Sequence, residues 1–301
     1  MQNEQIKKWM ERIADGVWKV FLAALTVATV WIVTKVFLLA SYSIPTDSME
    51  PTLTPGDYIL VDKTYMGARL FSLEAAFEQR PFTMHRTWGR HHLQAGDVAV
   101  FNYPYPQTRD SIGFDVMKYY VKRCMGAPGD SVEITGGHYR INGKPLTGLP
   151  EGVREMHDKL HRVFTVGEKK IEGVSIKAFP KKELGWTIVD FGPLRIPRAG
   201  DCLLMDRRHF LLYKTLIEWE QGKKLTWLPD GAYLDGRRLV TYRFRENYYF
   251  MAGDNVFNSV DSRYWGLVPE DYVAGKAVRI WKSVDPWTGE LRRDRLWKRI
   301  K

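Results

Sequence analysis

The sequence has few cysteines, no internal repeat and no low-complexity linker. Its two cysteines, Cys124 and Cys202, lie far apart in the chain, so they indicate neither a clustered metal site nor a dense disulfide framework. The 301 residues are 45% hydrophobic, which is enough to bury a full core in one large or two smaller domains. This composition excludes a disordered chain.

Acidic residues are also scarce relative to basic ones. Lys and Arg number 45 against 35 Asp and Glu, which gives a net charge of +10. This excess indicates an anionic neighbour, either nucleic acid or lipid head groups. From Arg279 onward the chain interleaves Trp281, Trp287 and Trp297 with basic residues, which favours head groups over an ordinary solvated edge. We therefore expect a phospholipid membrane as a partner, and no nucleic acid.

Only one long apolar run occurs, between Gly16 and Ala40. A helix of about 20 apolar residues crosses a bilayer core of roughly 30 Å. Lys19 and Lys35 stand near the two ends of the run, where their ammonium groups can reach opposite head-group layers. A secretory signal peptide is the rival interpretation, but the run is long for one and no small-residue cleavage site follows it. The sequence therefore predicts a transmembrane anchor at 16–36.

The arm before this anchor, residues 1–15, carries Lys7, Lys8 and Arg12. By the positive-inside rule, this basic arm stays in the cytoplasm. The remainder of the chain is then expected on the extracytoplasmic side of the plasma (inner) membrane, held by a single span.

The external part of the chain is predicted to be mostly β. Strand-like runs occupy 56–62, 96–101 and 119–125, whereas 64–95 has no regular pattern. Two hairpin signals follow, Asn142-Gly143 and Asp235-Gly236.

One helix is predicted from Arg207 to Gln221. Apolar residues from Phe210 to Ile217 recur there at helical spacing, and Gly222 can end the helix.

Ser48 lies between Pro45 and Pro51, and proline fixes φ and removes a backbone donor. We therefore expect the stretch 44–53 to be an extended, rigid path. A serine hydroxyl becomes a nucleophile when a base takes its proton, so the interpretation depends on which residue is that base. In a strand, Lys122 shares one face with Tyr120 and Cys124, where burial would lower the pKa of its amine.

On their own, these residues would more often be a turn serine and a solvated strand lysine. A polar stretch from Gly253 to Gly266, directly after an aromatic strand, adds a third signal. Its composition is typical of a loop fixed by side-chain hydrogen bonds and an ion pair.

Together these blocks resemble the bacterial type I signal peptidases, the leader peptidase family with a Ser/Lys dyad. The resemblance covers the apolar anchor and four further blocks in the family's order, namely 44–53, 96–101, 120–130 and 253–269. It implies a transmembrane helix followed by an antiparallel β-sheet catalytic domain and a β-rich inserted second domain. The catalytic domain would comprise 37–131 and 248–301, and the inserted accessory domain 132–247.

The resemblance also implies roles for individual residues. Ser48 would be the nucleophile and Lys122 the general base. The Thr46 hydroxyl would join the Ser48 amide in the oxyanion hole, and Ser259 would orient the lysine amine. A structural network would be formed by Arg123, Asp254, Asp261 and Arg263. Apolar pockets for small substrate side chains would be lined by Tyr42, Ile44, Met49, Leu53, Tyr120 and Val121.

The implied activity is the removal of N-terminal signal peptides from exported preproteins with small residues before the cut. The secretion machinery is a further expected partner. No cofactor is implied. The late loop departs from the family pattern, because Val256-Phe257 stands where an Arg-Asp pair is common.

Other interpretations remain at this point. A non-catalytic, anchored peptidase relative would bind export substrates or partners without cleaving them. A self-cleaving repressor would share Ser–Lys chemistry, but the sequence has a bilayer span where a helix-turn-helix is needed. His157 and His161 have an i,i+4 spacing that suits zinc, yet neither an HExxH motif nor a clear third ligand accompanies them, so we expect no metal site.

Overall fold

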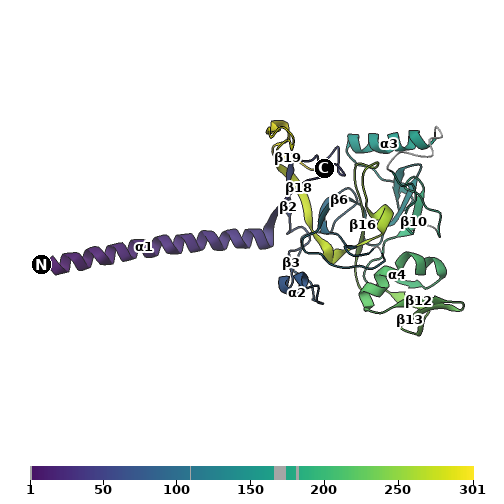
Figure 1. Ribbon diagram of the computed structural model, residues 1–301, viewed down its shortest axis with the longest axis horizontal. Helices are drawn as coiled ribbons and strands as arrows, with labels where there is room; N and C mark the ends of the chain where they lie inside the picture. The colour runs from purple at the N-terminus through teal and green to yellow at the C-terminus, as the bar shows by residue number, and fades with distance from the viewer. Residues whose placement is uncertain (1, 109, 166–173, 181–182) are drawn as a thin grey trace.

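The computed structural model describes residues 2–108, 110–165, 174–180 and 183–301. Figure 1 shows one long helix, α1 (Gln2–Val33), projecting away from a β-rich body. A π-helical turn, η1 (Thr34–Leu38), continues this helix and leads into the first strand, β1 (Leu39–Ser43).

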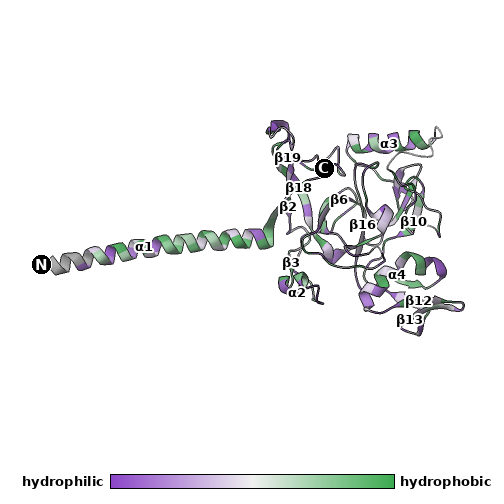
Figure 2. Cartoon of the chain, viewed as in Figure 1, coloured by the Kyte–Doolittle hydropathy of each residue, from purple (hydrophilic) through white to green (hydrophobic). Residues whose placement is uncertain are grey.

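The stretch Trp9–Leu38 is long and apolar enough to cross a membrane, and none of its apolar window is buried inside the protein. Figure 2 shows that hydrophobic residues cover much of α1. The anchor predicted at 16–36 lies within this stretch. The arm expected at 1–15 is helical from Gln2 onward and continuous with α1, because neither proline nor glycine interrupts the chain before Gly16.

The body is built on one antiparallel sheet with the strand order β1-β2-β18-β5-β6-β16-β17, and β19 pairs with β18 at its side. The strands are β2 (Asp57–Asp62), β5 (Val98–Asn102), β6 (Tyr119–Gly126), β16 (Tyr248–Ala252), β17 (Val268–Pro269), β18 (Val273–Ser283) and β19 (Lys298–Arg299). The predicted mostly β fold is confirmed, as are the three strands predicted at 56–62, 96–101 and 119–125.

The segment between β6 and β16, residues 132–247 in the prediction, adds smaller sheets and two helices. A four-stranded sheet has the order β10-β7-β8-β9, and β11-β15 and β12-β13-β14 form two further sheets. Their bounds are β7 (Ser131–Thr135), β8 (His138–Ile141), β9 (Lys144–Pro145), β10 (Phe191–Arg195), β11 (Cys202–Leu204), β12 (Leu225–Leu228), β13 (Gly231–Leu234), β14 (Arg237–Leu239) and β15 (Thr241–Arg243).

Both hairpin predictions are confirmed. Asn142-Gly143 joins β8 to β9, and Asp235-Gly236 joins β13 to β14. All four of these residues have positive φ, between 49° and 76°. Tight two-residue hairpins need this left-handed backbone, which Asn, Asp and Gly tolerate best.

The predicted helix α4 (Arg207–Gln221) is confirmed with the same bounds. Asp206 caps it by accepting a hydrogen bond from the His209 amide, and Gly222 ends it in the left-handed conformation. A second long helix, α3 (Glu151–Thr165), was not predicted. Short elements also occur where no regular structure was expected, at β3 (Arg69–Leu70), α2 (Leu73–Phe77) and β4 (His85–Arg86). The remaining helical turns are α5 (Ser262–Trp265), η2 (Glu270–Tyr272) and η3 (Arg293–Arg295).

The largest hydrophobic cluster joins the inserted segment to the main sheet. Met125 of β6 and Phe250 of β16 pack in the same cluster as Phe191 and Leu216 of the inserted segment. Burial of such apolar surface is the main favourable contribution to folding. The inserted segment therefore stabilises the sheet that carries Lys122 as well as itself, and its division from the catalytic domain stays a prediction.

Candidate active site

Ser48 lies in the loop between β1 and β2. The sequence predicted an extended loop, but the loop contains two turns. The Glu50 amide donates to Asp47 O at 2.9 Å, and the Leu53 amide donates to Met49 O at 2.9 Å. Pro51 has no N–H, but it leaves the amides of Glu50 and Leu53 free to close these two turns. The prediction was therefore wrong about the path of the loop.

The late loop after β16 holds the Ser48 loop in place. The Asn255 amide donates to Ser48 O at 3.2 Å, and its side chain donates to Asp47 O at 3.3 Å. The Asn258 side-chain amide lies 3.0 Å from both carboxylate oxygens of Asp47. Sequence reasoning identified a polar loop here but did not find this clamp, because its two halves are about 200 residues apart.

Glycine is required at position 253, where the late loop begins. A Cβ on Gly253 would lie 2.5 Å from Ser48 O and would collide with the Ser259 side chain. Because such contacts are too close for real Cβ atoms, only glycine lets β16 and the Ser48 loop approach this closely.

The structure brings Ser48 and Lys122 together. Lys122 is on β6, and its Nζ lies 2.5 Å from Ser48 Oγ. Only 4% of the lysine surface is exposed. Burial disfavours the charged ammonium and lowers the Lys122 pKa to about 8. A substantial fraction of the amine is thus neutral near physiological pH and able to accept a proton.

Three carboxylates near Lys122 oppose this effect of burial: Asp261 and Asp254 each have their own arginine, and Asp47 accepts from Asn258. Asp261 accepts from Arg263 at 2.8 and 2.7 Å, and Asp254 accepts from Arg123 at 2.7 Å through both of its oxygens. All four side chains are buried. Each pair is bidentate and its charges largely cancel, so neither carboxylate keeps Lys122 fully protonated. The predicted network of four charged residues thus forms two separate ion pairs.

Ser259 is buried beside this network. Its hydroxyl donates to Asp261 Oδ2 at 2.7 Å. The oxygen lone pairs remain to accept from the Lys122 amine, so the orienting role stays a prediction. Thr46 Oγ1 lies 3.4 Å from Ser48 Oγ, on the exposed side of the nucleophile.

The predicted pocket residues divide between two clusters. Ile44, Met49 and Leu53 pack in one hydrophobic cluster, against which Tyr42 and Val121 lie. Tyr120 faces a different cluster and stacks on Tyr103, with ring centroids 4.6 Å apart. Met49 and Leu53 are 1% and 0% exposed, so in this structure they support the site from beneath and do not face solvent.

An open strand edge lies next to the dyad. Residues Tyr119 to Arg123 of β6 pair with β5 on one side, whereas β16 pairs on the other side only with residues between Arg123 and Gly126. Among the described strands, none pairs with Val121 or Lys122 on that side. A peptide backbone can add to such an edge.

The two histidines have structural partners instead of a metal. His157 Nδ1 lies 2.9 Å from Gly137 O, and His161 Nδ1 lies 2.8 Å from Gly136 O, so α3 is fixed to the β7–β8 turn. Within the described ranges, no group of three or more His, Cys, Asp or Glu could hold a metal ion. Cys124 and Cys202 are not disulfide-bonded.

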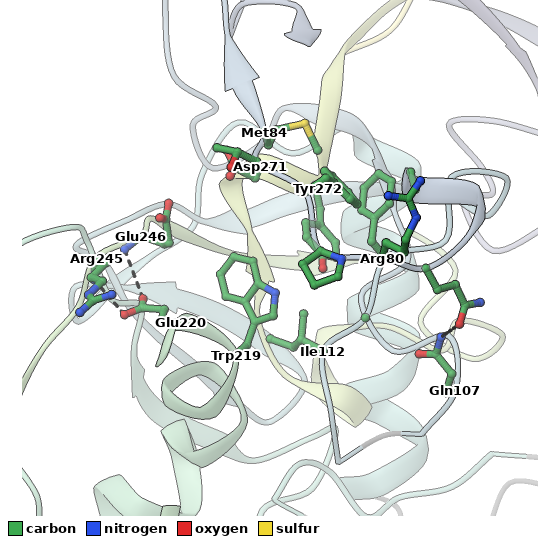
Figure 3. Close-up of a pocket in the computed structure, with 17 residues that line it drawn as sticks. Arg80, Met84, Gln107, Ile112, Trp219, Glu220, Arg245, Glu246, Asp271 and Tyr272 are labelled. Atoms are coloured by element: carbon green, nitrogen blue, oxygen red, sulfur yellow. Dashed lines mark hydrogen bonds between the residues drawn. The ribbon is translucent and has the colours of Figure 1, made fainter. Parts of the chain in front are cut away.

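A larger cavity, of about 680 Å³, lies elsewhere in the body, and no predicted site residue lines it. Figure 3 shows Trp219 and Tyr272 in its wall with Glu220 and Glu246 on one side. Burial, followed by the nearby carboxylates, raises the Glu246 pKa to about 7. The catalytic candidate is therefore the dyad site and not this cavity.

A serine hydroxyl beside a buried amine on a β-sheet is the arrangement that defines one class of serine hydrolases, those that use lysine as the base. A family model described as "Signal peptidase, peptidase S26" matches residues 17–282. The chain therefore belongs to the signal peptidase family S26 and is a serine peptidase by class. The self-cleaving repressor is thereby set aside.

Curated relatives agree with this family. The chain is 29% identical over 267 residues to "Signal peptidase I" of Buchnera aphidicola subsp. Baizongia pistaciae, covering 87% of this chain and 77% of the relative. It is 29% identical over 264 residues to "Signal peptidase I" of Pseudomonas fluorescens, covering 84% and 68%. A solved signal peptidase I structure from Enterococcus faecalis is 19% identical and covers 62% of this chain and 96% of its own, with a TM-score of 0.28.

Proposed function

We propose that this protein is a membrane-anchored endopeptidase that removes signal peptides from exported preproteins, with Ser48 as nucleophile and Lys122 as general base. The single observation that carries the mechanism is the 2.5 Å separation of Ser48 Oγ and Lys122 Nζ, with the amine shielded from water. Hydrogen-bond reach and a pKa near the working pH are the two requirements of a general base.

In the first half of the reaction, the neutral Lys122 amine takes the Ser48 proton as Oγ attacks the scissile carbonyl carbon. The Ser48 amide and the Thr46 hydroxyl donate hydrogen bonds to the resulting oxyanion. The Lys122 ammonium then gives its proton to the leaving nitrogen, the C–N bond breaks, and the mature protein departs with a free amine.

In the second half, the signal peptide is bound to Ser48 as an ester. Lys122, neutral again, takes a proton from water as the water oxygen attacks this ester. Collapse of the intermediate returns the proton to Ser48 Oγ and releases the signal peptide with a carboxylate. Ser259 accepts from the lysine and keeps the amine directed at Ser48 throughout.

The open edge of β6 supports a mode of substrate binding. The residues before the scissile bond extend along Tyr120 and Val121 as an added strand, which places the carbonyl near Ser48. Only small side chains fit at the first and third positions before the cut, because the apolar residues Ile44, Met49 and Leu53 are already closely packed beneath the site.

Location in the membrane is the remaining part of the proposal. The apolar helix spans the bilayer, its basic N-terminal end stays in the cytoplasm, and the body lies outside near the secretion machinery. Trp287 and Trp297 are exposed and suit contact with head groups, whereas Trp281 donates to Ser41 Oγ at 2.7 Å.

The test uses the full chain purified in detergent and a preprotein with alanines at the first and third positions before the cut. Wild type is expected to cleave at that position, and Ser48→Ala and Lys122→Ala are expected to be inactive. Lys223→Ala, at an exposed lysine on another face, is the matched control and should cleave normally. Normal cleavage by Ser48→Ala would refute the proposed mechanism.

A further inference from the structure

A second cavity lies where the apolar helix enters the body. Its volume is about 400 Å³, within the range of small-ligand sites. Its walls come from η1, β1, the end of β2, the β3–α2 region and β6. In Figure 1, β2, β3 and α2 lie near the end of α1 where it meets the body. The cavity shares Tyr42 with the predicted substrate site, but neither Ser48 nor Lys122 lines it.

Three cationic side chains line this cavity: Lys35, Lys63 and Arg69. Among the described residues of its wall, none carries a carboxylate. The Lys63 ammonium donates to Lys35 O at 2.8 Å and to Val36 O at 3.2 Å, so it is fixed at the end of the helix. Burial, followed by the charges of Arg69 and Lys35, lowers the Lys63 pKa.

Arg69 is held by the body and adds its positive charge to this cavity. Its Nη1 donates to Asn102 Oδ1 at 2.7 Å and to Tyr272 O at 2.9 Å, both neutral acceptors. The nearest acidic influence is Asp271, which Arg86 also approaches at 3.9 Å. The three cations at this cavity are therefore compensated only in part, by one carboxylate that Arg86 shares. A bound anion would reduce the repulsion between them.

The rim of the cavity is apolar on the side next to the helix. Val36, Leu70 and Leu73 line it and are 39%, 39% and 58% exposed. They continue the apolar surface of the helix, on which Leu38 is also exposed. Such a site offers positive charge inside and a hydrophobic path leading out toward the helix.

We propose that this cavity binds the phosphate headgroup of an anionic phospholipid, with an acyl chain lying over Leu70 and Leu73. The proposal rests on the membrane anchoring given above, because anchoring puts the cavity at the level of the lipid head groups. A segment of the preprotein is the rival occupant, but an apolar peptide would leave the three cations without an anion. Free phosphate would satisfy the cations and leave the apolar rim unused.

The experiment measures lipid retained by the full chain, purified in detergent, by native mass spectrometry. The probes are phosphatidylglycerol, phosphatidylcholine and inorganic phosphate. Wild type is expected to retain phosphatidylglycerol in preference to phosphatidylcholine, and millimolar inorganic phosphate is expected not to displace it. Lys63→Gln and Lys35→Gln should each weaken retention about fivefold, from roughly 1 kcal/mol per basic residue. Lys223→Gln is the matched control and should retain lipid as wild type does.

Leu73→Asp provides an independent variant. Leu73 is exposed at the start of α2, where an acidic residue is compatible with the helix, so the fold should survive. It should weaken retention by disrupting the apolar rim and adding negative charge. Equal retention of both lipids, full displacement by inorganic phosphate, or unchanged retention in all three variants would overturn the proposal.

The proposal and the proposed function fail in different ways. Lipid retention is measured without a preprotein, so an inactive wild type would leave the lipid result standing. Failure of the full chain to insert into vesicles would instead contradict the anchoring. Displacement of the lipid by a signal peptide, at wild-type and variant sites alike, would identify the preprotein as the occupant.

Discussion

Lys122 and Lys63 are both lysines that burial makes easier to deprotonate, but their surroundings differ. Near Lys122, the two buried carboxylates of Asp261 and Asp254 are each paired with an arginine, so burial dominates and the pKa falls to about 8. Near Lys63, the charged neighbours are Lys35 and Arg69, and the ammonium is fixed by backbone carbonyls. A buried lysine surrounded by balanced charges suits proton transfer, whereas one among other cations suits binding an anion.

The largest expected effect is the loss of activity when Lys122 is replaced, which the same change at Lys63 should not cause. Lys122→Met should lower kcat/KM for preprotein cleavage by on the order of 10⁴-fold or more, because no other group replaces the base. Lys63→Met, the matched change at the other lysine, should leave cleavage of a soluble peptide in lipid-free detergent within a few-fold of wild type. Equal losses of kcat/KM in the two variants would show that Lys122 is no more important for cleavage than Lys63.

A smaller loss is expected from the oxyanion side of the dyad. Thr46→Val keeps the shape of the side chain and removes its hydroxyl, so kcat should fall on the order of 10²-fold with little change in KM. Thr46→Ser keeps the hydroxyl and should recover most of the rate. A Thr46→Val enzyme with the wild-type rate would exclude the hydroxyl from the oxyanion hole.

The buried Lys122 amine should also lower the free energy of unfolding at neutral pH. Its pKa is about 8 when folded and 10.5 when unfolded, so the protonated lysine is disfavoured by folding. Below pH 8 both states are protonated and the full penalty applies, roughly 3 kcal/mol. Lys122→Met should therefore be more stable than wild type near pH 7 in denaturant unfolding, and this advantage should shrink between pH 8 and 10.5. An advantage that does not change with pH would contradict the desolvated amine.

The pH profile tests how the charge balance sets the Lys122 pKa. Activity of wild type should fall on the acid side near pH 8, because the protonated amine cannot accept the Ser48 proton. Burial lowers this pKa and the Asp261 carboxylate raises it, so Asp261→Asn should move the acid limb to lower pH. A shift to higher pH, or none, would mean that Asp261 does not influence the base.

The smallest effect is expected at Lys63. In vesicles of phosphatidylglycerol, Lys63→Gln should change cleavage only a few-fold, because the bound lipid lies beside the site and takes no part in bond breaking. The measurement is the ratio of variant to wild-type rates in phosphatidylglycerol and in phosphatidylcholine vesicles. A loss as large as that of Lys122→Met would place Lys63 in the catalytic machinery.

The sequence predicted elements whose signals are local. The helix α4 followed from apolar spacing flanked by a good cap at each end, and both hairpins followed from residues that tolerate positive φ. Helix α3 begins directly after Pro150, whose side chain has no hydrogen-bonding group, so the start of the helix carried no capping signal, although Val153 and Leu160 occupy its buried face. Local patterns thus identify elements best when both ends are marked.

Long-range contacts could not be derived from spacing. Ser48 and Lys122 were paired through a family resemblance, since residues 74 positions apart carry no mutual signal. Two further features depend on segments that meet only in the folded chain. One is the clamp from Asn258 to Asp47, and the other is the cavity lined by Lys35, Lys63 and Arg69. The turned path of the Ser48 loop has a local cause instead: Pro45 and Pro51 favour an extended path, but the amides of Glu50 and Leu53 remain free to close two turns.

Val256 and Phe257, the departure in the late loop, have a consequence for the inserted segment. Val256 is buried against Leu160 and Val189, and Phe257 packs at the same cluster beneath the Lys159 ammonium. Excising residues 132–247 would therefore expose the apolar side chains of Val256 and Phe257 to water. They directly follow Asn255, whose amide donates a hydrogen bond to Ser48 O. A shortened enzyme would need polar residues at positions 256 and 257 for the late loop to keep its conformation and hold Ser48 in place.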